Sequence, residues 1–391
     1  MMIERIRKLR NCLWLTELNR VAGMTPGSIR ELLKIWPDLD SLAGLSANQI
    51  TEAVQGPPDK INRLRSKLRD KNWLERLDIQ AKDAAAQGIF ASFSGDQDFP
   101  SRLKEISSCP IALYIRGEHF SEIMSSGFFV TVIGTRSPTA YGRMITEKIT
   151  TDLVRKDVVI ISGLARGIDA VAHRSALKAK GPTIAVVGNG PDIPYPPEHL
   201  ELMEEIAASG LIISEHPPGT PPRKQNFPAR NRILSGLADA VAVIEASVNS
   251  GTMITAGFAG DQGRDVFAVP GSILSPFSQG CNHLIRDGAE VLESADDLLW
   301  RLPLGWMQSR LENLIRREYQ QIEDQEESAK NCRRLMLHTL AGNPLTLAEI
   351  TQQTAMTISE AAILLTSLEI EGMLQCERGR YSLTRRAISS I

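Results

Sequence analysis

The sequence predicts an α/β protein with a Rossmann-like, doubly wound and mainly parallel sheet, flanked by an N-terminal helical domain and a C-terminal winged helix. Three observations support this prediction. Strand-like and helix-like segments alternate between residues 128 and 269, as in chains that form parallel sheets. The strand-like segments are short, apolar and rich in β-branched residues, which is typical of strands covered on both faces. Small polar turns follow several of them, where such folds bind their ligands.

Residues 1–85 are predicted to form the helical domain. Apolar residues recur at helical spacing over 29–36, and the segment 32–50 is similar to a helix-hairpin-helix or SAM-like bundle. A run rich in Lys and Arg follows at 60–76. Trp73, Leu74 and Leu77 give its helix an apolar stripe, so we interpret the charges as a solvated face.

Residues 86–305 are predicted to form an extended Rossmann-like domain. Its first part, 88–117, is extended and rich in turns. Strand-like segments then stand at 128–133, 158–161, 183–187, 211–214, 240–245 and 265–269. The helix-like segments between them are 141–156, 169–179, 198–208, 230–238 and 252–262.

A linker and a small domain are predicted after residue 305. Residues 306–330 are hydrophilic and include an acidic run, which indicates a boundary. Residues 331–391 form the predicted winged helix, with helices at 335–340, 347–354 and 358–371 and strand-like pieces at 374–376 and 381–383. Its third helix carries glutamates and no basic residue, which favours a structural or protein-contact role over reading of duplex DNA.

The charge balance and the cysteines exclude several classes of protein. Lys and Arg total 44 and Asp and Glu total 46, giving a formal net charge of -2, so a phosphate site must be a local patch. There is no apolar run that could span a bilayer and no signal-peptide pattern, so we expect a cytoplasmic protein with no membrane partner. The five cysteines are scattered, without a CxxC or Cys/His cluster, so neither a metal site nor a disulfide framework is expected.

Three turns that contain glycine are predicted to bind phosphate. They lie at residues 134–137, 162–167 and 247–252. Each stands between a strand-like and a helix-like segment, where bare backbone N–H groups and a helix N-terminus face an anion. In the second turn we expect Gly163 and Gly167 to let the backbone approach a ligand closely.

A basic patch adds to these turns. Lys224 precedes the segment 227–232, in which Arg230 and Arg232 can neutralise phosphates, while Asn231 bonds a base edge or anchors the loop. Several phosphates could be contacted at once along this edge, so nucleic acid or a nucleotide is the expected ligand. The candidate DNA- and phosphate-binding residues are Gly134, Thr135, Arg136, Ser162, Gly163, Arg166, Gly167, Lys224, Arg230, Asn231, Arg232, Ser250, Gly251 and Thr252.

No catalytic residue and no cofactor is predicted. The chain has neither the dinucleotide fingerprint nor a P-loop, and it shows no set of nucleophile, base and orienting group. Asp169 and His173 are four residues apart on one helix face, and we interpret them as a structural pair in which Asp169 bonds His173. Glu245 is open to two interpretations: a general acid/base, or a carboxylate that bonds backbone N–H groups and fixes a loop.

Six segments together resemble one family. They are DFPSRLKEI at 98–106, VIGTRSPTAYG at 132–142, SGLARGIDAVAHRSAL at 162–177, FPARNRILSGLADAVAVIEA at 227–246, SGTMITA at 250–256 and GRDVFAVPGS at 263–272. In this order they resemble the DNA-processing protein A family (DprA, also called Smf), and the resemblance covers essentially the whole chain. The family's phosphate-holding turn maps to residues 134–136. One modest departure is Asn189 in the turn Gly188–Gly190.

The resemblance implies a function. It implies a non-catalytic, cytoplasmic protein that binds and protects incoming single-stranded DNA and helps load the RecA recombinase during natural transformation. It also implies a homodimer formed through the Rossmann-like domain. The alternative is a phosphoribohydrolase-type enzyme acting on nucleotides. Such enzymes carry a Pro-Gly-Gly-x-Gly-Thr loop, and residues 246–252 lack its Pro-Gly-Gly.

Overall fold

The computed structural model describes residues 2–22, 62, 66, 70–125, 127–299, 331–341 and 343–384. The chain divides into two compact units, Met1–Leu302 and Pro303–Ile391. No helix among the described residues has the length and apolar character needed to cross a membrane. The bundle expected at 32–50 and the linker expected at 306–330 lie outside the described residues, so both stay predictions.

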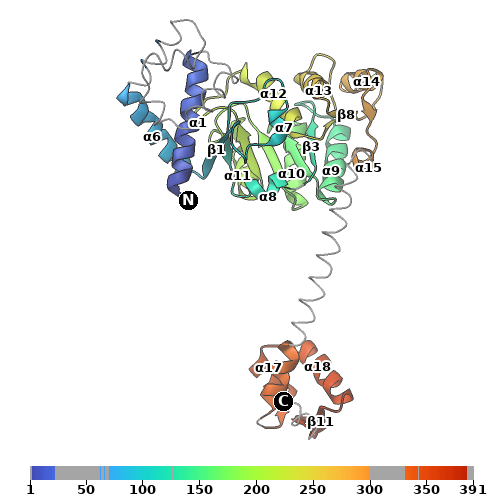
Figure 1. Cartoon of the computed structure of the whole chain (residues 1–391). Helices are drawn as coiled ribbons and strands as arrows, with labels where there is room; N and C mark the ends of the chain where they lie inside the picture. The colour runs from blue at the N-terminus through green and yellow to red at the C-terminus, as the bar shows by residue number, and fades with distance from the viewer. Residues whose placement is uncertain are drawn as a thin grey trace. The chain divides into compact units, whose positions relative to one another are not determined.

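Nine strands form one sheet in the first unit (Figure 1). They are β1 (Ile89–Phe93), β2 (Ala112–Arg116), β3 (Phe129–Ile133), β4 (Val159–Ser162), β5 (Thr183–Val186), β6 (Leu211–Ser214), β7 (Ala240–Val243), β8 (Asp265–Ala268) and β9 (Glu290–Val291). Their order is β1-β2-β6-β5-β4-β3-β7-β8-β9. From β6 to β9 all neighbours are parallel, whereas β1 and β2 are antiparallel additions at one edge.

The strand order reverses at β3. From β3 the chain builds β4, β5 and β6 to one side and later returns to build β7, β8 and β9 on the other. This reversal opens a crevice at the carboxyl ends of β3 and β7, which is where open α/β sheets bind ligands.

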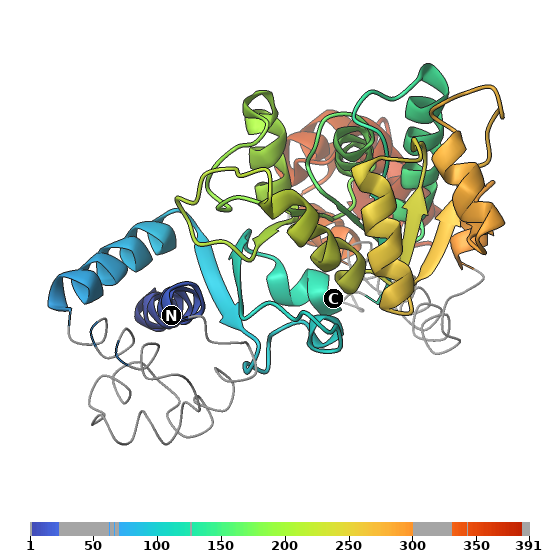
Figure 2. The same cartoon turned by 90° about the horizontal axis from the view of Figure 1, so that it is seen from above.

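Helices cover both faces of the sheet. They are α7 (Ser101–Lys104), α8 (Phe120–Ser125), α9 (Ala140–Val154), α10 (Ile168–Lys178), the 3₁₀ turn η1 (Pro197–His199), α11 (Leu200–Ser209), α12 (Asn226–Leu237), α13 (Gly251–Asp261), α14 (Gln279–Arg286) and α15 (Ala295–Leu299). In β5, Ile184 packs in one core with Leu234 of α12, whereas Ala185 packs in another with Ile206 of α11. Successive strand residues therefore bury against opposite layers of helices, and α12 and α13 lie side by side in Figure 2.

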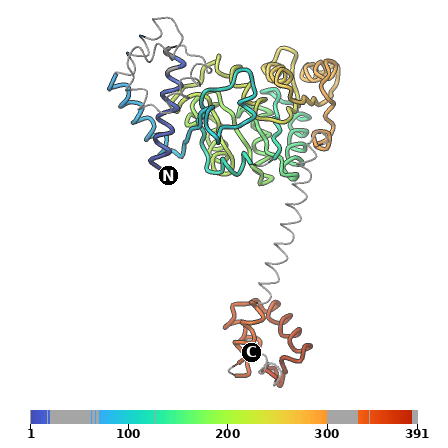
Figure 3. Tube along the Cα trace, in the orientation of Figure 1, coloured from blue at the N-terminus to red at the C-terminus, as the bar shows by residue number. Residues whose placement is uncertain are grey.

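Two further helices, α1 (Met2–Ala22) and α6 (Lys71–Ala86), extend this unit at the β1 edge (Figure 3). Trp14, Trp73 and Leu77 are buried in one core with Ile89 of β1 and Tyr114 of β2. This confirms that the apolar stripe of the second helix is buried. The predicted boundary after residue 85 does not separate compact units, because these helices share their core with the sheet.

The second unit contains a helical segment at 331–340, α17 (Leu347–Thr354) and α18 (Ile358–Ile370), and the strands β10 (Leu345–Thr346), β11 (Leu374–Glu377) and β12 (Arg380–Leu383). The strands form a sheet in the order β10-β12-β11. Thr346 with Glu349, and Thr357 with Glu360, form capping boxes that begin α17 and α18. The helices and the hairpin follow each other as predicted, and β10 is an addition.

The alternation predicted for the centre of the first unit is confirmed by β3 to β8 and the helices between them. The edge strands β1, β2 and β9 were not predicted. Helix α12 begins at Asn226, four residues before its predicted start at Arg230. Pro228 is then the third residue of α12. A proline, which has no N–H, is tolerated there because the N–H groups of a helix's first turn have no partner within the helix.

Candidate functional site

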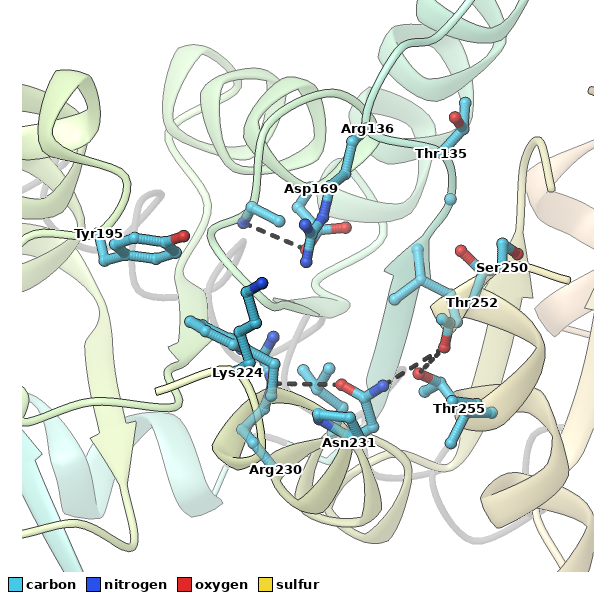
Figure 4. A pocket seen from close by; sticks show the side chains of 18 residues that line it. Thr135, Arg136, Asp169, Tyr195, Lys224, Arg230, Asn231, Ser250, Thr252 and Thr255 are labelled. Carbon is cyan, nitrogen blue, oxygen red and sulfur yellow. Dashed lines mark hydrogen bonds between the residues drawn. The ribbon is translucent and has the colours of Figure 1, made fainter. Parts of the chain in front are cut away.

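A pocket of about 590 Å³ opens at the carboxyl edge of the sheet (Figure 4). The turns after β3, β4 and β7 line it, together with the start of α12 and a Pro-rich loop after β5. The predicted site residues that line it are Gly134, Thr135, Arg136, Lys224, Arg230, Asn231, Ser250, Gly251 and Thr252. The pocket therefore coincides with the crevice that the strand order creates.

Two cations face the pocket with no partner among the described residues. The side chains of Arg136 and Lys224 are exposed, and both extend toward the middle of the pocket in Figure 4. Neither makes a hydrogen bond or ion pair to the part of the chain that the structure describes. Free guanidinium and ammonium groups at one opening attract an anion such as phosphate.

The first predicted phosphate turn is partly filled by the protein's own carboxylate. Glu245 is buried and accepts hydrogen bonds from the Thr139 backbone N–H at 2.9 Å and from its hydroxyl at 2.5 Å. Thr139 in turn caps α9 by accepting from the Gly142 N–H. Of the two interpretations of Glu245, the structure supports the one in which it fixes a loop. The N-terminus of α9 is thus not open to a ligand.

The second predicted turn is also occupied from within. The Asp169 carboxylate lies in the first turn of α10 and accepts from the Ala165 N–H at 3.3 Å. A Cβ at Gly163 would come within 2.7 Å of this carboxylate and 2.8 Å of the Arg230 guanidinium. A Cβ at Gly167 would come within 2.2 Å of the Thr135 carbonyl oxygen. These two glycines therefore permit close approach by the protein's own groups, and their expected contact with a ligand stays a prediction.

The Arg230 side chain is buried and makes its hydrogen bonds within the fold. It is 5% exposed, and its guanidinium donates to the Gly163 carbonyl at 2.9 Å and to the Val186 carbonyl. Burial lowers the pKa of Arg230 to about 10, although the Asp169 carboxylate acts in the opposite direction. Arg230 lines the pocket, but part of its guanidinium is already bonded to Gly163 and to Val186 at the end of β5, so its expected contact with phosphate stays a prediction.

The third predicted turn remains open. Helix α13 begins at Gly251 and has no acidic residue in its first turn, and the Ser250 side chain makes no cap. The amide of Asn231 donates to the Gly251 carbonyl at 3.4 Å, so it anchors this turn to α12. The positive end of the α13 dipole therefore faces the pocket without a protein carboxylate.

Tyr195, which no sequence pattern predicted as a site residue, marks an aromatic wall at the other end of the pocket in Figure 4. The rings of Tyr195 and Phe227 have their centroids 5.2 Å apart, and Tyr195 is 38% exposed. Exposed aromatic rings stack on nucleobases. Tyr195 follows β5 in the turn Pro191–Pro197, so its place after a strand was the signal that could have indicated it.

The remaining candidates do not line the pocket: Ser162, Gly163, Arg166, Gly167 and Arg232. The Ser162 hydroxyl is buried and donates to the Val132 carbonyl. Arg166 is exposed and pairs with Glu198. Arg232 pairs with Glu215 at 2.6 Å and does not line the pocket, so its expected role in the basic patch stays a prediction.

The expected bond between Asp169 and His173 is wrong. The His173 ring nitrogen Nδ1 lies 2.8 Å from the Thr183 hydroxyl, which itself donates to the Ile160 carbonyl. Burial lowers the pKa of His173 to about 3, so this ring is neutral at physiological pH. Asp169 and His173 lie on one helix face but do not bond each other, because Thr183 of β5 offers His173 a partner.

We expect the affinity of the pocket for an anion to depend on pH through Asp169. Burial raises the pKa of Asp169 to about 6, so the folded protein holds this proton more tightly than the unfolded chain does. The contribution of Asp169 to stability therefore falls as pH rises from about 4 to about 6. The same proton removes a negative charge beside the pocket, so affinity for an anionic ligand should rise about fivefold between pH 7.5 and pH 5, on the order of 1 kcal/mol.

Titrations with an anion such as inorganic phosphate, at constant ionic strength, check this dependence. Asp169→Asn should flatten the pH profile between pH 5 and pH 7, with folding monitored by circular dichroism. An unchanged profile in a folded Asp169→Asn protein would assign the pH dependence to another group.

Comparisons with known proteins agree with one another. Residues 91–303 match the family model for DNA recombination-mediator protein A. The chain is 43% identical over 217 residues to DNA processing protein DprA of Bacillus subtilis, covering 56% of this chain and 72% of that protein. It is 40% identical over 311 residues to Protein Smf of Synechocystis sp., covering 73% and 78% of the two chains. The X-ray structure of DNA processing protein A from Streptococcus pneumoniae matches with a TM-score of 0.59 at 34% identity, covering 74% of this chain and 97% of that chain.

Proposed function

The chain belongs to the DNA recombination-mediator protein A family, and on this premise we propose that its pocket binds single-stranded DNA. The single observation that carries the proposal is the composition of the pocket. Arg136 and Lys224, which have no partner among the described residues, line one opening with the open N-terminus of α13 and the aromatic pair Tyr195–Phe227. Cations with stacking rings are the combination that single-strand binding proteins use.

The shape of the site favours single strands over duplex. A base can reach the Tyr195 ring inside a pocket only if it leaves the duplex stack, and this costs a few kcal/mol for a paired base. A flexible strand presents its bases at much lower cost. The pocket therefore discriminates by access rather than by reading base edges.

Competition between two DNA forms tests this proposal. A labelled oligothymidylate bound to the full chain should be displaced by unlabelled single strands at far lower concentration than by blunt duplex of equal length. Both competitors must be compared at one salt concentration, because phosphate contacts make affinity depend on salt. Equal displacement by the duplex would contradict the proposal.

The finer roles belong to the same proposal. We propose that the protein protects incoming single strands, helps load the RecA recombinase during natural transformation, and works in the cytoplasm as a homodimer through its Rossmann-like domain. Family membership supports these roles.

We also propose that the second unit is a winged helix, supported by its order of helices and hairpin. The exposed face of α18 carries Glu360 and Glu369, which favours a protein-contact role over DNA reading.

The alternative, a phosphoribohydrolase-type enzyme, places its catalytic acid at Glu245. In the structure this carboxylate is 3% exposed, does not line the pocket, and is bonded to Thr139. A group held in this way cannot reach a bound nucleotide. We therefore propose that the protein is not an enzyme.

Glu245→Gln tests that proposal. One amide oxygen cannot replace both carboxylate acceptors at Thr139, so the free energy of unfolding should fall by about 1–2 kcal/mol. Denaturant unfolding followed by far-UV circular dichroism measures the loss. Hydrolysis assays with nucleoside monophosphates should show no turnover in either protein. Turnover that disappears in a folded Glu245→Gln variant would support the enzyme instead.

A further inference from the structure

The pocket has two chemically different ends. Tyr195, whose ring packs on that of Phe227, marks an aromatic end. Ser250 and Thr252 mark a polar end on the opposite side in Figure 4. Arg136 and Lys224 extend into the space between them. A volume of about 590 Å³ lies within the range of small-molecule sites. This arrangement fits one nucleotide, with its base at the aromatic end and its phosphate at the polar end.

The polar end holds a hydroxyl without a partner. Thr252 is 8% exposed and lines the pocket, yet its hydroxyl makes no hydrogen bond to any described residue. The Ser250 hydroxyl oxygen is itself buried and has no partner among the described residues. Buried polar groups are nearly always hydrogen-bonded in native proteins, so unpaired hydroxyls in a pocket point to a ligand that accepts from them.

Backbone donors accompany these hydroxyls. The N–H of Met253 bonds the Ser250 carbonyl at 3.1 Å, but the N–H groups of Gly251 and Thr252, at the start of α13, have no intrahelical partner. Two hydroxyls and two N–H groups at the positive end of a helix favour the phosphate with more negative charge and more acceptor oxygens, and an internal phosphodiester has one negative charge and two non-bridging oxygens. A terminal phosphate monoester has three such oxygens and a second negative charge.

We propose that the pocket prefers a nucleotide whose phosphate is a monoester over an internal nucleotide of a strand. Two ligands carry this chemistry: a free nucleoside monophosphate and the 5′-phosphorylated end of a DNA strand. The inference rests on the proposed function, since it concerns the same pocket. Its consequence is that free nucleotides compete with single-stranded DNA, or that the protein engages phosphorylated strand ends first.

Calorimetric titration of the full chain with thymidine 5′-monophosphate, thymidine and inorganic phosphate tests the first source. A pair of oligothymidylates, one 5′-phosphorylated and one with a 5′-hydroxyl, tests the second. We expect a preference for the monoester of at least tenfold in one of these arms. Thr252→Val removes the hydroxyl at constant shape and should lower that preference about tenfold, as expected for a hydrogen bond to a charged group. Thr252→Ser should retain it.

Thr150→Val is the matched control. The Thr150 hydroxyl on α9 is also buried without a partner among the described residues, but it does not line the pocket, so this variant should keep the monoester preference. Absence of a preference in both arms, or a preference that Thr252→Val leaves unchanged, would overturn the inference. If the inference is overturned but the 5′-hydroxyl oligonucleotide still binds normally, the proposed function is retained. Monoester binding without any oligonucleotide binding would instead contradict the proposed function.

Discussion

Replacing Arg136 and Lys224 together with alanine is expected to weaken binding of single-stranded DNA by at least about 100-fold at fixed salt. Each side chain is exposed at the pocket and has no partner among the described residues, so its charge is available to a phosphate. A charge-assisted hydrogen bond contributes about 1.5–3 kcal/mol, and two such losses give the stated effect. Fluorescence anisotropy with a labelled oligothymidylate measures it.

The double variant Lys148→Ala/Arg155→Ala is the matched control. It removes an equal number of positive charges, from Lys148 in α9 and from Arg155 directly after it. Both side chains are exposed and neither lines the pocket. This control should bind as tightly as the wild type. Because Arg136 and Lys224 bond no described residue, their removal should also leave the unfolding midpoint unchanged. Equal weakening in both double variants would mean that only net charge matters and that the pocket is not the site.

Arg230→Ala is expected to destabilise the fold by about 3–5 kcal/mol, which is the typical cost of removing one partner of a buried ionic group. The substitution leaves the buried Asp169 carboxylate without its opposite charge and the Gly163 and Val186 carbonyls without their donor. Urea unfolding followed by far-UV circular dichroism measures the loss, because the helices and strands of the first unit give most of the far-UV signal.

A second substitution separates structure from binding. Asp169→Asn in the Arg230→Ala background removes the uncompensated carboxylate, so the double variant should recover part of the lost stability. A fully stable Arg230→Ala protein that fails to bind DNA would show instead that Arg230 is a direct ligand, as the sequence alone had suggested.

The sheet was predictable because its signals are local. Each parallel strand is a short apolar run, and each is followed by a helix of ordinary length, so alternation alone defined β3 to β8. The edge strands were missed because Ala112–Arg116 and Ile89–Phe93 stand in a turn-rich region without regular alternation. Their pairing with each other and with β6 depends on contacts distant in sequence.

The site was predictable only in its location. The turns after the strands correctly indicated the sheet edge, and the segments around Arg136 and Ser250 meet there. The sequence did not reveal which helix N-termini are already occupied. Glu245 and Thr139 are 106 residues apart, and Arg230 and Gly163 are 67 apart. Such pairings emerge only when the strands are aligned in the sheet.

The salt dependence of oligothymidylate binding tests the central claim, that Arg136 and Lys224 neutralise phosphates of a single strand in this pocket. For single strands, the logarithm of the association constant falls by about 0.7 per logarithmic unit of salt for each neutralised phosphate. We predict that Arg136→Ala/Lys224→Ala lowers the magnitude of this slope by about 1.4, while the Lys148→Ala/Arg155→Ala control keeps the wild-type slope. A wild-type slope in the pocket variant, or an equal reduction in the control, would contradict the claim.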